Sequence, residues 1–236
     1  MSANDPLPIV LVPGLAATPL LYADQIPALW RFGSVTIADH TRDDSMAGIA
    51  RRLLAAAPPR FALAGLSMGG YIAFEVMRQA PERIVKLALL DTSARADTPE
   101  QTQARRTQMD MARTGRYAEV AEVQLPRLLS RAGQADARLR DLAVHMMVDV
   151  GPETFIRQQT AIMGRPDSRP DLGGIRCPTL VLVGDQDELT PPERAAEIAD
   201  GIPGARLVTV PGCGHLSSIE QPAAVTRALV DWLASA

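Results

Sequence analysis

The stretch FALAGLSMGGYIAFEVMRQ, residues 61–79, constrains the fold of this chain more than any other part of the sequence. An apolar run over residues 61–66 predicts a short buried strand, and the segment after the motif Gly-Leu-Ser-Met-Gly has the apolar spacing of a helix. A serine on so sharp a turn sits in strained backbone, and the residues two before and two after it approach each other. Gly65 and Gly69 fit this crowding because they have no side chain. The context predicts that Ser67 is an exposed nucleophile; an ordinary turn with a serine helix cap is the alternative.

Strand and helix signals alternate through the first part of the chain. Apolar runs predict strands over residues 9–12, 35–38, 61–66 and 84–90. Helical segments separate them over residues 18–29, 45–57 and 68–79, the first with Thr18 as its cap and Pro19 at its first position. This alternation is typical of a parallel sheet with right-handed crossovers.

The alternation stops after about residue 95. Residues 96–169 contain no strand-like run, and we predict four helical pieces there, over residues 99–113, 117–131, 135–148 and 152–163. Strands are predicted again over residues 178–183 and 206–210, with helices over residues 190–200 and 222–233. We therefore predict a core formed by residues 1–95 and 170–236, with residues 96–169 as an inserted helical cap.

The overall composition narrows the possible partners and location. A hydrophobic content of 47% in 236 residues is enough for a large core. A net charge of −3 gives no reason to expect a nucleic-acid partner or an anionic membrane surface. The N-terminus lacks the basic segment of a signal peptide, and no stretch has the length of a membrane span. We predict a soluble cytoplasmic protein, with Cys177 and Cys213 as free thiols in a reducing compartment.

Polar side chains follow the predicted strands at the edge where ligands bind in open parallel sheets. They include a serine, several carboxylates and a histidine, in the order Gly14-Leu15, Asp39, Ser67, Asp91, Asp187 and His215. We predict that His215, in a glycine-containing loop after the last strand, is the base that activates Ser67. Of the other two histidines, His40 precedes the nucleophile in the chain and His145 lies on a predicted cap helix.

Two aspartates lie between the serine and the histidine at strand ends. We predict that Asp187 orients His215, because the loop GDQDELT is long enough to turn its carboxylate toward the crevice. A capping box formed by Thr190 and Glu193 at the next helix would leave Asp187 free of capping. Asp91 precedes Thr92-Ser93, where an aspartate commonly closes a local turn, and Asp185 is expected to brace its own loop.

An oxyanion needs two N–H donors beside the serine. Met68, which begins the helix after Ser67, supplies one of them. The other is expected from the loop after the first strand, where Gly14 permits the turn and the N–H of Leu15 is the predicted donor.

Four motifs in order, VLVPGLAAT, LAGLSMGG, LVGDQDELTPP and PGCGHLSSIEQP, cover most of the chain. With them the chain resembles the α/β-hydrolase superfamily, in its branch of small capped esterases, lactonases and thioesterases. The resemblance implies an α/β fold with a core of about six mostly parallel strands flanked by helices and an inserted helical cap. The chain departs from the family in having Pro13-Gly14 where His-Gly is usual, and in having few residues before its first strand.

The residues and the resemblance together predict acyl transfer to water through Ser67, His215 and Asp187. The expected partner is a small, largely apolar carboxylic ester, and no metal or organic cofactor is required. Lactones and thioesters remain alternative substrates. Cofactor-free perhydrolysis or lyase chemistry at the same site, and a ligand sensor with little turnover, are alternative functions. The sequence does not indicate an oligomeric state.

Overall fold

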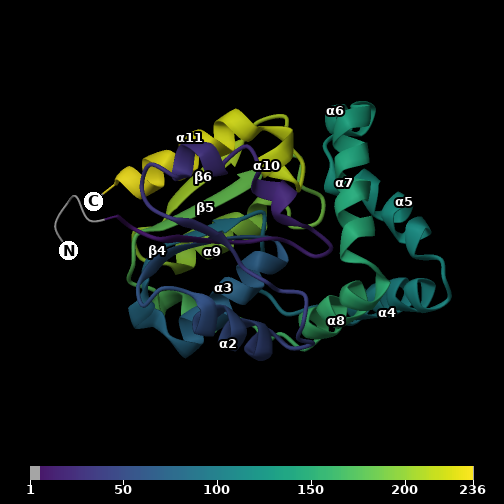
Figure 1. Ribbon diagram of the computed structural model, residues 1–236, viewed down its shortest axis with the longest axis horizontal. Coiled ribbons are helices and arrows are strands. Elements are labelled where there is room, and N and C mark those ends of the chain that lie inside the picture. The colour runs from purple at the N-terminus through teal and green to yellow at the C-terminus, as the bar shows by residue number, and fades with distance from the viewer. Residues whose placement is uncertain (1–5, 236) are drawn as a thin grey trace.

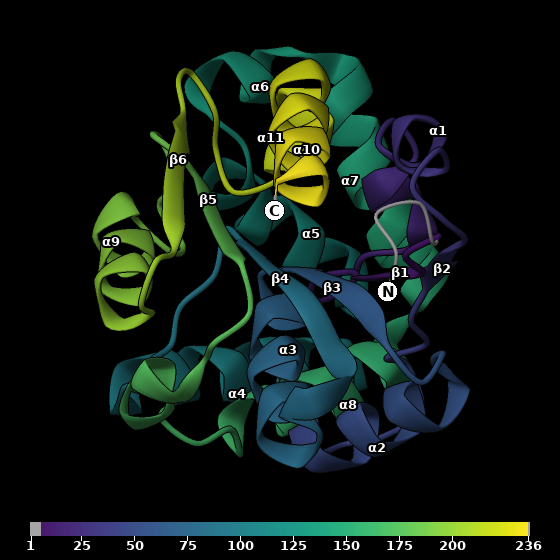
Figure 2. The ribbon, with the colours of Figure 1, turned by 90° about the vertical axis from the view of Figure 1, so that its left-hand side faces the viewer.

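The centre of the protein is a six-stranded sheet in which every pairing of neighbouring strands is parallel (Figures 1 and 2). The strands are β1 (Ile9–Val12), β2 (Val35–Ile37), β3 (Phe61–Leu66), β4 (Ile84–Leu90), β5 (Thr179–Gly184) and β6 (Arg206–Val210). Their order across the sheet is β2-β1-β3-β4-β5-β6. The expected core of six parallel strands flanked by helices is confirmed.

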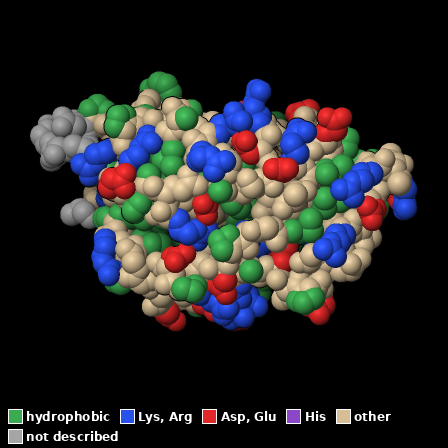
Figure 3. Space-filling view, turned by 90° about the horizontal axis from the view of Figure 1, so that it is seen from below, with side chains coloured by type: hydrophobic (Ala, Val, Ile, Leu, Met, Phe, Trp, Pro, Cys, Tyr) green, Lys and Arg blue, Asp and Glu red, His purple; other side chains and the backbone are tan. Residues whose placement is uncertain are grey.

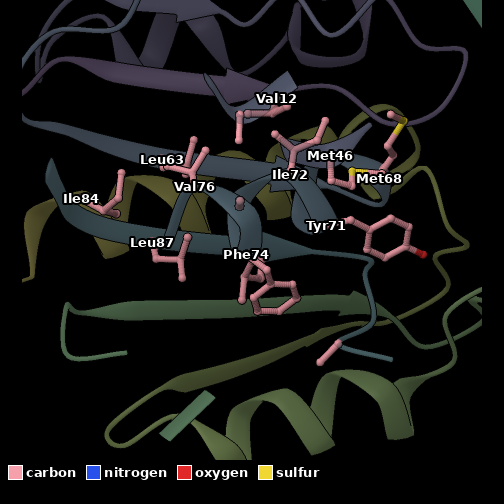
Figure 4. Close-up of a cluster of buried hydrophobic side chains, with 14 of the residues drawn as sticks. Val12, Met46, Leu63, Met68, Tyr71, Ile72, Phe74, Val76, Ile84 and Leu87 are labelled. Atoms are coloured by element: carbon pink, nitrogen blue, oxygen red, sulfur yellow. The ribbon is translucent and has the colours of Figure 1, made fainter. Parts of the chain in front are cut away.

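Alternate residues of each strand face opposite sides of the sheet, and each side is covered by its own helices. Val10 and Val12 pack on the side of α2 (Met46–Ala56), α3 (Met68–Gln79) and α9 (Pro192–Gly201). Figure 4 shows Leu63 and Leu87 of the strands with Ile72 and Val76 of α3 in this cluster. The other side is covered by short and long helices near both ends of the chain: η1 (Pro19–Tyr22), α1 (Ile26–Leu29), α10 (Ser217–Glu220) and α11 (Pro222–Ala234).

Five α-helices lie between β4 and β5 and gather beyond one end of the sheet (Figure 1). They are α4 (Pro99–Arg113), α5 (Tyr117–Leu128), α6 (Arg131–Ala135), α7 (Ala137–Val150) and α8 (Pro152–Met163). A separate buried cluster, which includes Val120, Met147 and Phe155, holds these helices together. We call α4–α8 the helical insertion. The remaining short helices are η2 (Pro81–Arg83) and η3 (Arg169–Gly174).

Two helical segments differ from the prediction. The expected helix over residues 18–29 is divided into η1 and α1, because a proline at position 27 has no N–H and its ring would clash with the carbonyl of Ala23. The helical insertion has five helices rather than four. The extra helix is α6, which lies where a break between two helices was expected. The side chain of Ser130 caps α6 and that of Asp136 caps α7, so both helices begin at capped residues.

The computed structural model describes residues 6–235. The prediction that the chain lacks a signal peptide depends on the N-terminus, and residues 1–5 lie outside the described residues. No helix within residues 6–235 combines the length and the apolar character needed to cross a bilayer. Cys177 is half-buried and Cys213 is buried, and neither is in a disulfide.

Candidate active site

The turn around Ser67 has the strained geometry that the motif predicts. Ser67 has a φ of 57° and a ψ of −115°, an uncommon region for a residue with a side chain. A Cβ at Gly65 would lie 2.2 Å from the carbonyl oxygen of Gly69. A Cβ at Gly69 would lie 2.1 Å from the carbonyl oxygen of Val12 at the end of β1. Only glycine fits at both positions, and the turn holds Ser67 at the end of β3.

The structure brings three of the predicted residues into one chain of hydrogen bonds. Nε2 of His215 lies 2.8 Å from Oγ of Ser67, and Nδ1 of His215 lies 2.8 Å from Oδ2 of Asp187. His215 and Asp187 are each 2% exposed. The contacts place a hydroxyl, an imidazole and a carboxylate in a line, with little access of water to the two titratable groups.

The Asp187 carboxylate accepts three further hydrogen bonds beside the one from His215. Oδ1 accepts from the N–H of Leu189 and of Thr190, both at 2.9 Å, and Oδ2 accepts from the Thr190 hydroxyl at 2.7 Å. The predicted capping box at the next helix is therefore wrong: α9 begins at Pro192, and the Thr190 hydroxyl is bound to Asp187 instead. These donors stabilise the ionised form and fix its orientation.

Charge pairing sets the protonation of these two groups. Burial alone raises the pKa of Asp187, but the charge and hydrogen bond of His215 and the bonds from Thr190 lower the net pKa below its usual value. Burial alone lowers the pKa of His215, but the charge and hydrogen bond of Asp187 raise the net pKa above that of an ordinary histidine. Asp187 therefore remains ionised at neutral pH and favours the protonated form of His215.

Asp91 lies beside the hydrogen-bonded residues but is not bonded to His215 within residues 6–235. It is fully buried at the end of β4 and accepts from the N–H of Gly184 at 3.0 Å and from the Ser217 hydroxyl. The expectation of a local turn with Thr92-Ser93 is wrong, because both partners are distant in sequence. Burial, together with the charge of Asp187, raises the pKa of Asp91 to about 8. Asp91 thus connects the end of β5 to the segment after His215.

The loop after β1 lies against the serine and is held by two buried side chains. A Cβ at Gly14 would be 3.4 Å from Cβ of Ser67. The carbonyl oxygen of Gly14 accepts from Nε2 of His40 at 2.9 Å, and the N–H of Ala16 donates to Oε1 of Gln158 at 2.9 Å. Since the C=O and N–H of a trans peptide point in opposite directions, the N–H of Leu15 points away from His40.

The two predicted oxyanion donors remain available in this arrangement. Neither the N–H of Leu15 nor that of Met68 has a hydrogen-bond acceptor within residues 6–235. Met68 is the first residue of α3, directly after Ser67. His40 and Gln158 hold the loop after Pro13-Gly14 on either side of Leu15.

A cavity of about 200 Å³ opens above Ser67 and His215. The core contributes small and apolar residues to its lining, such as Leu15, Ala17, Leu66 and Leu216. The helical insertion contributes side chains from α4, α5, α7 and α8, among them Arg105, Gln108, Gln124, Arg127, Met146 and Ile162. Within the described part of the chain, no group of three or more His, Cys, Asp and Glu side chains is arranged to hold a metal ion.

Comparison with known proteins places this geometry in a family. The model of the alpha/beta hydrolase family matches residues 9–228. The chain belongs to this family. A Mycobacterium tuberculosis protein, provisionally named the non-heme bromoperoxidase BpoC, is 30% identical over 191 residues, which cover 76% of this chain and 69% of that protein.

Two solved structures of family members are similar over almost the whole chain. An esterase from Thermogutta terrifontis, with malate bound, has a TM-score of 0.89 and 31% identity, and the match covers 96% of this chain and 89% of the esterase. The enol-lactonase from Burkholderia xenovorans LB400 has a TM-score of 0.86 and 26% identity, covering 100% of this chain and 94% of the lactonase. Hydrolases of the family thus share this fold in detail.

Sequence reasoning missed the residues that connect the helical insertion to the reacting groups. Glu220 accepts from the N–H of Ser130 and of Gly214, both at 2.9 Å, and the N–H of His215 donates to the carbonyl of Leu128 at 3.0 Å. These contacts fix the loop of His215 against the end of α5. Glu220 lies five residues after His215, but no local pattern in the sequence indicates its partner 90 residues away.

The other candidate residues lie away from the cavity. His145 is exposed on α7 and pairs with Asp149 at 3.3 Å. Asp185 accepts from the N–H of Cys213 at 3.1 Å, so it joins its own loop to the loop of His215, whereas bracing of its own loop was expected.

Proposed function

We propose that this chain is a serine hydrolase that cleaves a small carboxylic ester through an acyl-enzyme on Ser67. The observation that carries this proposal is the unbroken chain of hydrogen bonds from Asp187 through His215 to Ser67, with two contacts of 2.8 Å. The strained turn at Ser67 and the available N–H groups of Leu15 and Met68 support it. Together they provide the nucleophile, the base and the oxyanion donors that acyl transfer needs.

In the first half of the reaction, Oγ of Ser67 bonds to the ester carbonyl carbon while its proton passes to Nε2 of His215. The carbonyl oxygen becomes an oxyanion, to which the N–H groups of Leu15 and Met68 donate. His215 then gives its proton to the departing alcohol oxygen as the C–O bond breaks, and the acyl group remains on Ser67.

In the second half, a water molecule attacks the acyl carbon and His215 accepts the proton of that water. Collapse of the second oxyanion releases the carboxylic acid, and the proton returns from His215 to Oγ of Ser67. Asp187 keeps the proton of His215 on Nδ1 throughout, which leaves Nε2 as the acceptor. Its bonds from Leu189 and Thr190 prevent the carboxylate from turning away.

The helical insertion, within residues 96–169, acts as a cap in this proposal. It supplies one whole side of the cavity, and its contacts with the loop of His215 position it above Ser67. Substrate selection would then involve α4, α5, α7 and α8, together with the larger core side chains that line the cavity, such as Tyr71 and Arg194.

Lactones, thioesters and peroxide-dependent acyl transfer use the same acyl-enzyme and are the alternatives to test. The names of the enol-lactonase and bromoperoxidase relatives are the reason to test lactones and peroxide. A panel of butyryl esters, a butyryl thioester and matched lactones, each with and without peroxide, separates these activities. We expect the highest kcat/KM for an ester with water as acceptor. A higher kcat/KM for lactones or thioesters would change the proposed substrate class. Peracid as the main product would show that the activity is perhydrolysis and not hydrolysis.

A further inference from the structure

The lining of the cavity carries an unusual charge. Five arginines contribute to it: Arg95, Arg105, Arg127, Arg165 and Arg194. No aspartate or glutamate lines it among the described residues. The outer surface is different, because basic and acidic side chains are interspersed on the face shown in Figure 3 and the whole chain has a net charge of −3. The lining also differs from the expectation of a largely apolar substrate.

Three of the five arginines are paired. Arg105 and Arg165 bind the two oxygens of Asp97 at 2.7 and 2.8 Å, and the side chain of Asp97 is 2% exposed. Arg95 pairs with Glu197 at 2.8 Å. One carboxylate shared by two guanidinium groups leaves one positive charge on this group of three residues. The paired arginines therefore do not neutralise the cavity.

Arg127 and Arg194 have no such partner. Within residues 6–235, neither guanidinium group forms an ion pair or a hydrogen bond with a side chain or carbonyl. Arg127 comes from α5 and lines the same cavity as His215. Arg194 lies in the first turn of α9, four residues after Thr190. Each guanidinium is permanently charged and carries five N–H donors, so each is available to bind an acceptor from a ligand.

The rest of the lining includes both polar and apolar side chains. Gln101, Gln108 and Gln124 come from α4 and α5, as Arg105 and Arg127 do. Ala143, Met146 and Met147 of α7 contribute apolar surface. A substrate that matches both kinds of residue has a short apolar chain and a second polar, negatively charged group.

We propose that the cavity binds an ester that carries a free carboxylate in addition to the bond that is cleaved, and that Arg127 and Arg194 bind this carboxylate. This inference rests on the proposed function, because it places the scissile carbonyl at Ser67. A planar carboxylate matches the fork of N–H donors on a guanidinium group. A compact dicarboxylic acid monoester also suits a cavity of about 200 Å³. Arg127 and Arg194 are then specificity residues for the charged end of the substrate.

A matched pair of substrates tests this directly. The p-nitrophenyl monoester of glutaric acid and its methyl ester differ at the distal carboxyl group, which is ionised at pH 7 in the acid and is a neutral methyl ester in the other substrate. Release of p-nitrophenol reports cleavage of the p-nitrophenyl ester bond in both. We expect kcat/KM of wild type to be about tenfold higher for the acid than for the methyl ester. This ratio should fall as the salt concentration rises, because salt screens partly exposed charges.

Substitution identifies the arginines responsible. We expect Arg127→Gln and Arg194→Gln each to reduce the ratio about threefold or more, and the double variant to bring it to about one or below. Arg106→Gln is the matched control, because Arg106 lies on α4, is exposed and does not line the cavity. It should leave both kcat/KM values unchanged. Thermal unfolding of all variants verifies that they are folded, as expected for partly or fully exposed positions.

The outcomes separate this inference from the proposed function. If the methyl ester is cleaved but wild type shows no preference for the acid, or the double variant retains the preference, the anionic subsite is wrong and the serine hydrolase stands. If neither ester is cleaved, the proposed function fails. Calorimetric titration of glutarate into wild type and the double variant then decides the subsite independently, and equal or absent binding overturns it.

Discussion

The core side and the insertion side of the cavity are built from different kinds of contact. On the core side, Ser67, His215 and Asp187 are within single hydrogen bonds of one another, and the last two are almost fully buried. On the insertion side, Arg127 is exposed and without a partner in residues 6–235, and Gln124 has only one side-chain partner, Gln108, at 3.2 Å. Reacting groups are thus held rigidly, and the groups that meet the rest of the substrate retain freedom to adapt.

The two sides nevertheless meet at two points. Gln158 of α8 binds the N–H of Ala16 in the loop after β1, which holds the proposed oxyanion donor Leu15. Glu220 joins the loop of His215 to Ser130. Both contacts connect the helical insertion to a segment that the reaction uses. Variants of the groups hydrogen-bonded around Ser67 should therefore change the rate of every substrate, whereas variants of exposed cavity residues such as Arg127 should change the choice among substrates.

The largest effect is expected at the nucleophile. Ser67→Ala removes the atom that bonds to the acyl group, so we expect kcat to fall by about 10⁶-fold, as for other serine triads, with the fold retained. A fluorophosphonate should label wild type and not the variant. Ser93→Ala is the control, because Ser93 lines the cavity but its hydroxyl contacts the backbone of Arg95. Labelling of Ser67→Ala would exclude Ser67 as the nucleophile.

Asp187→Asn should produce the next largest loss. An amide in place of the carboxylate favours the wrong tautomer of His215, and we expect kcat to fall about 10⁴-fold with little loss of stability. The control is Asp185→Asn, since Asp185 lies two residues away in the same loop and its carboxylate accepts from Cys213 and not from His215. Near-normal kinetics in Asp187→Asn, together with a large loss in Asp91→Asn, would assign the role to Asp91.

The pH dependence sharpens this result. The charge of Asp187 holds the pKa of His215 above its usual value of about 6.5, despite burial. The base must be neutral to accept the serine proton, so activity should be present above this raised pKa and lost as pH falls through it. In Asp187→Asn the residual activity should extend to lower pH. If activity falls at the same pH in wild type and Asp187→Asn, a group other than His215 controls this pH dependence.

His40 tests the support of the oxyanion loop. His40→Ala removes the donor to the carbonyl of Gly14, and we expect kcat to fall about tenfold to a hundredfold while KM changes less. His40→Gln, which retains an N–H donor at a similar reach, should recover part of kcat. Burial lowers the pKa of His40, so its donor is a neutral imidazole and the effect should not depend on pH near 7. Equal changes in kcat and stability for both variants would indicate a packing role only.

The smallest effect on rate is expected at Asp91, where stability changes instead. Asp91→Ala leaves the N–H of Gly184 and the Ser217 hydroxyl without their buried acceptor, at a cost of about 1–3 kcal/mol. The folded pKa of about 8 lies above the usual unfolded value near 3.9. The stabilisation is therefore complete below the unfolded pKa and is lost as pH rises through 8.

Asp91→Asn isolates the contribution of Asp91 to the pH dependence of the free energy of unfolding. The amide resembles the protonated acid, so the variant should lose the decline in stability between about pH 4 and 8 that wild type shows. Chemical denaturation at several pH values measures it. The same slope in both proteins would contradict a raised pKa at Asp91.

The sequence predicted local structure far better than contacts between distant segments, for a physical reason. β3, β4 and β6 match their apolar runs to the residue, and α4 and α8 begin at Pro99 and Pro152 as expected. Short-range sterics and capping determine such features, and the same holds for the turn at Ser67.

The partners of the reacting groups depend on contacts between distant segments. Gln158 binds a residue 142 positions away, and Asp91 binds one 126 positions away. The arginines of the cavity come from separate elements of the chain, and no local pattern predicts that they face one cavity. Thr190 was misassigned because its motif resembles a helix cap, and only the fold shows Asp187 as its partner.

The acyl-enzyme itself is the most direct test of the central claim. Wild type mixed with a p-nitrophenyl ester is quenched with acid within the first turnover, digested and analysed by mass spectrometry. We predict that the mass of one acyl group appears on the peptide that contains Ser67, and that it disappears at the rate of turnover. Product release with no acylated Ser67 at any time, or an acyl group on another residue, would contradict the mechanism.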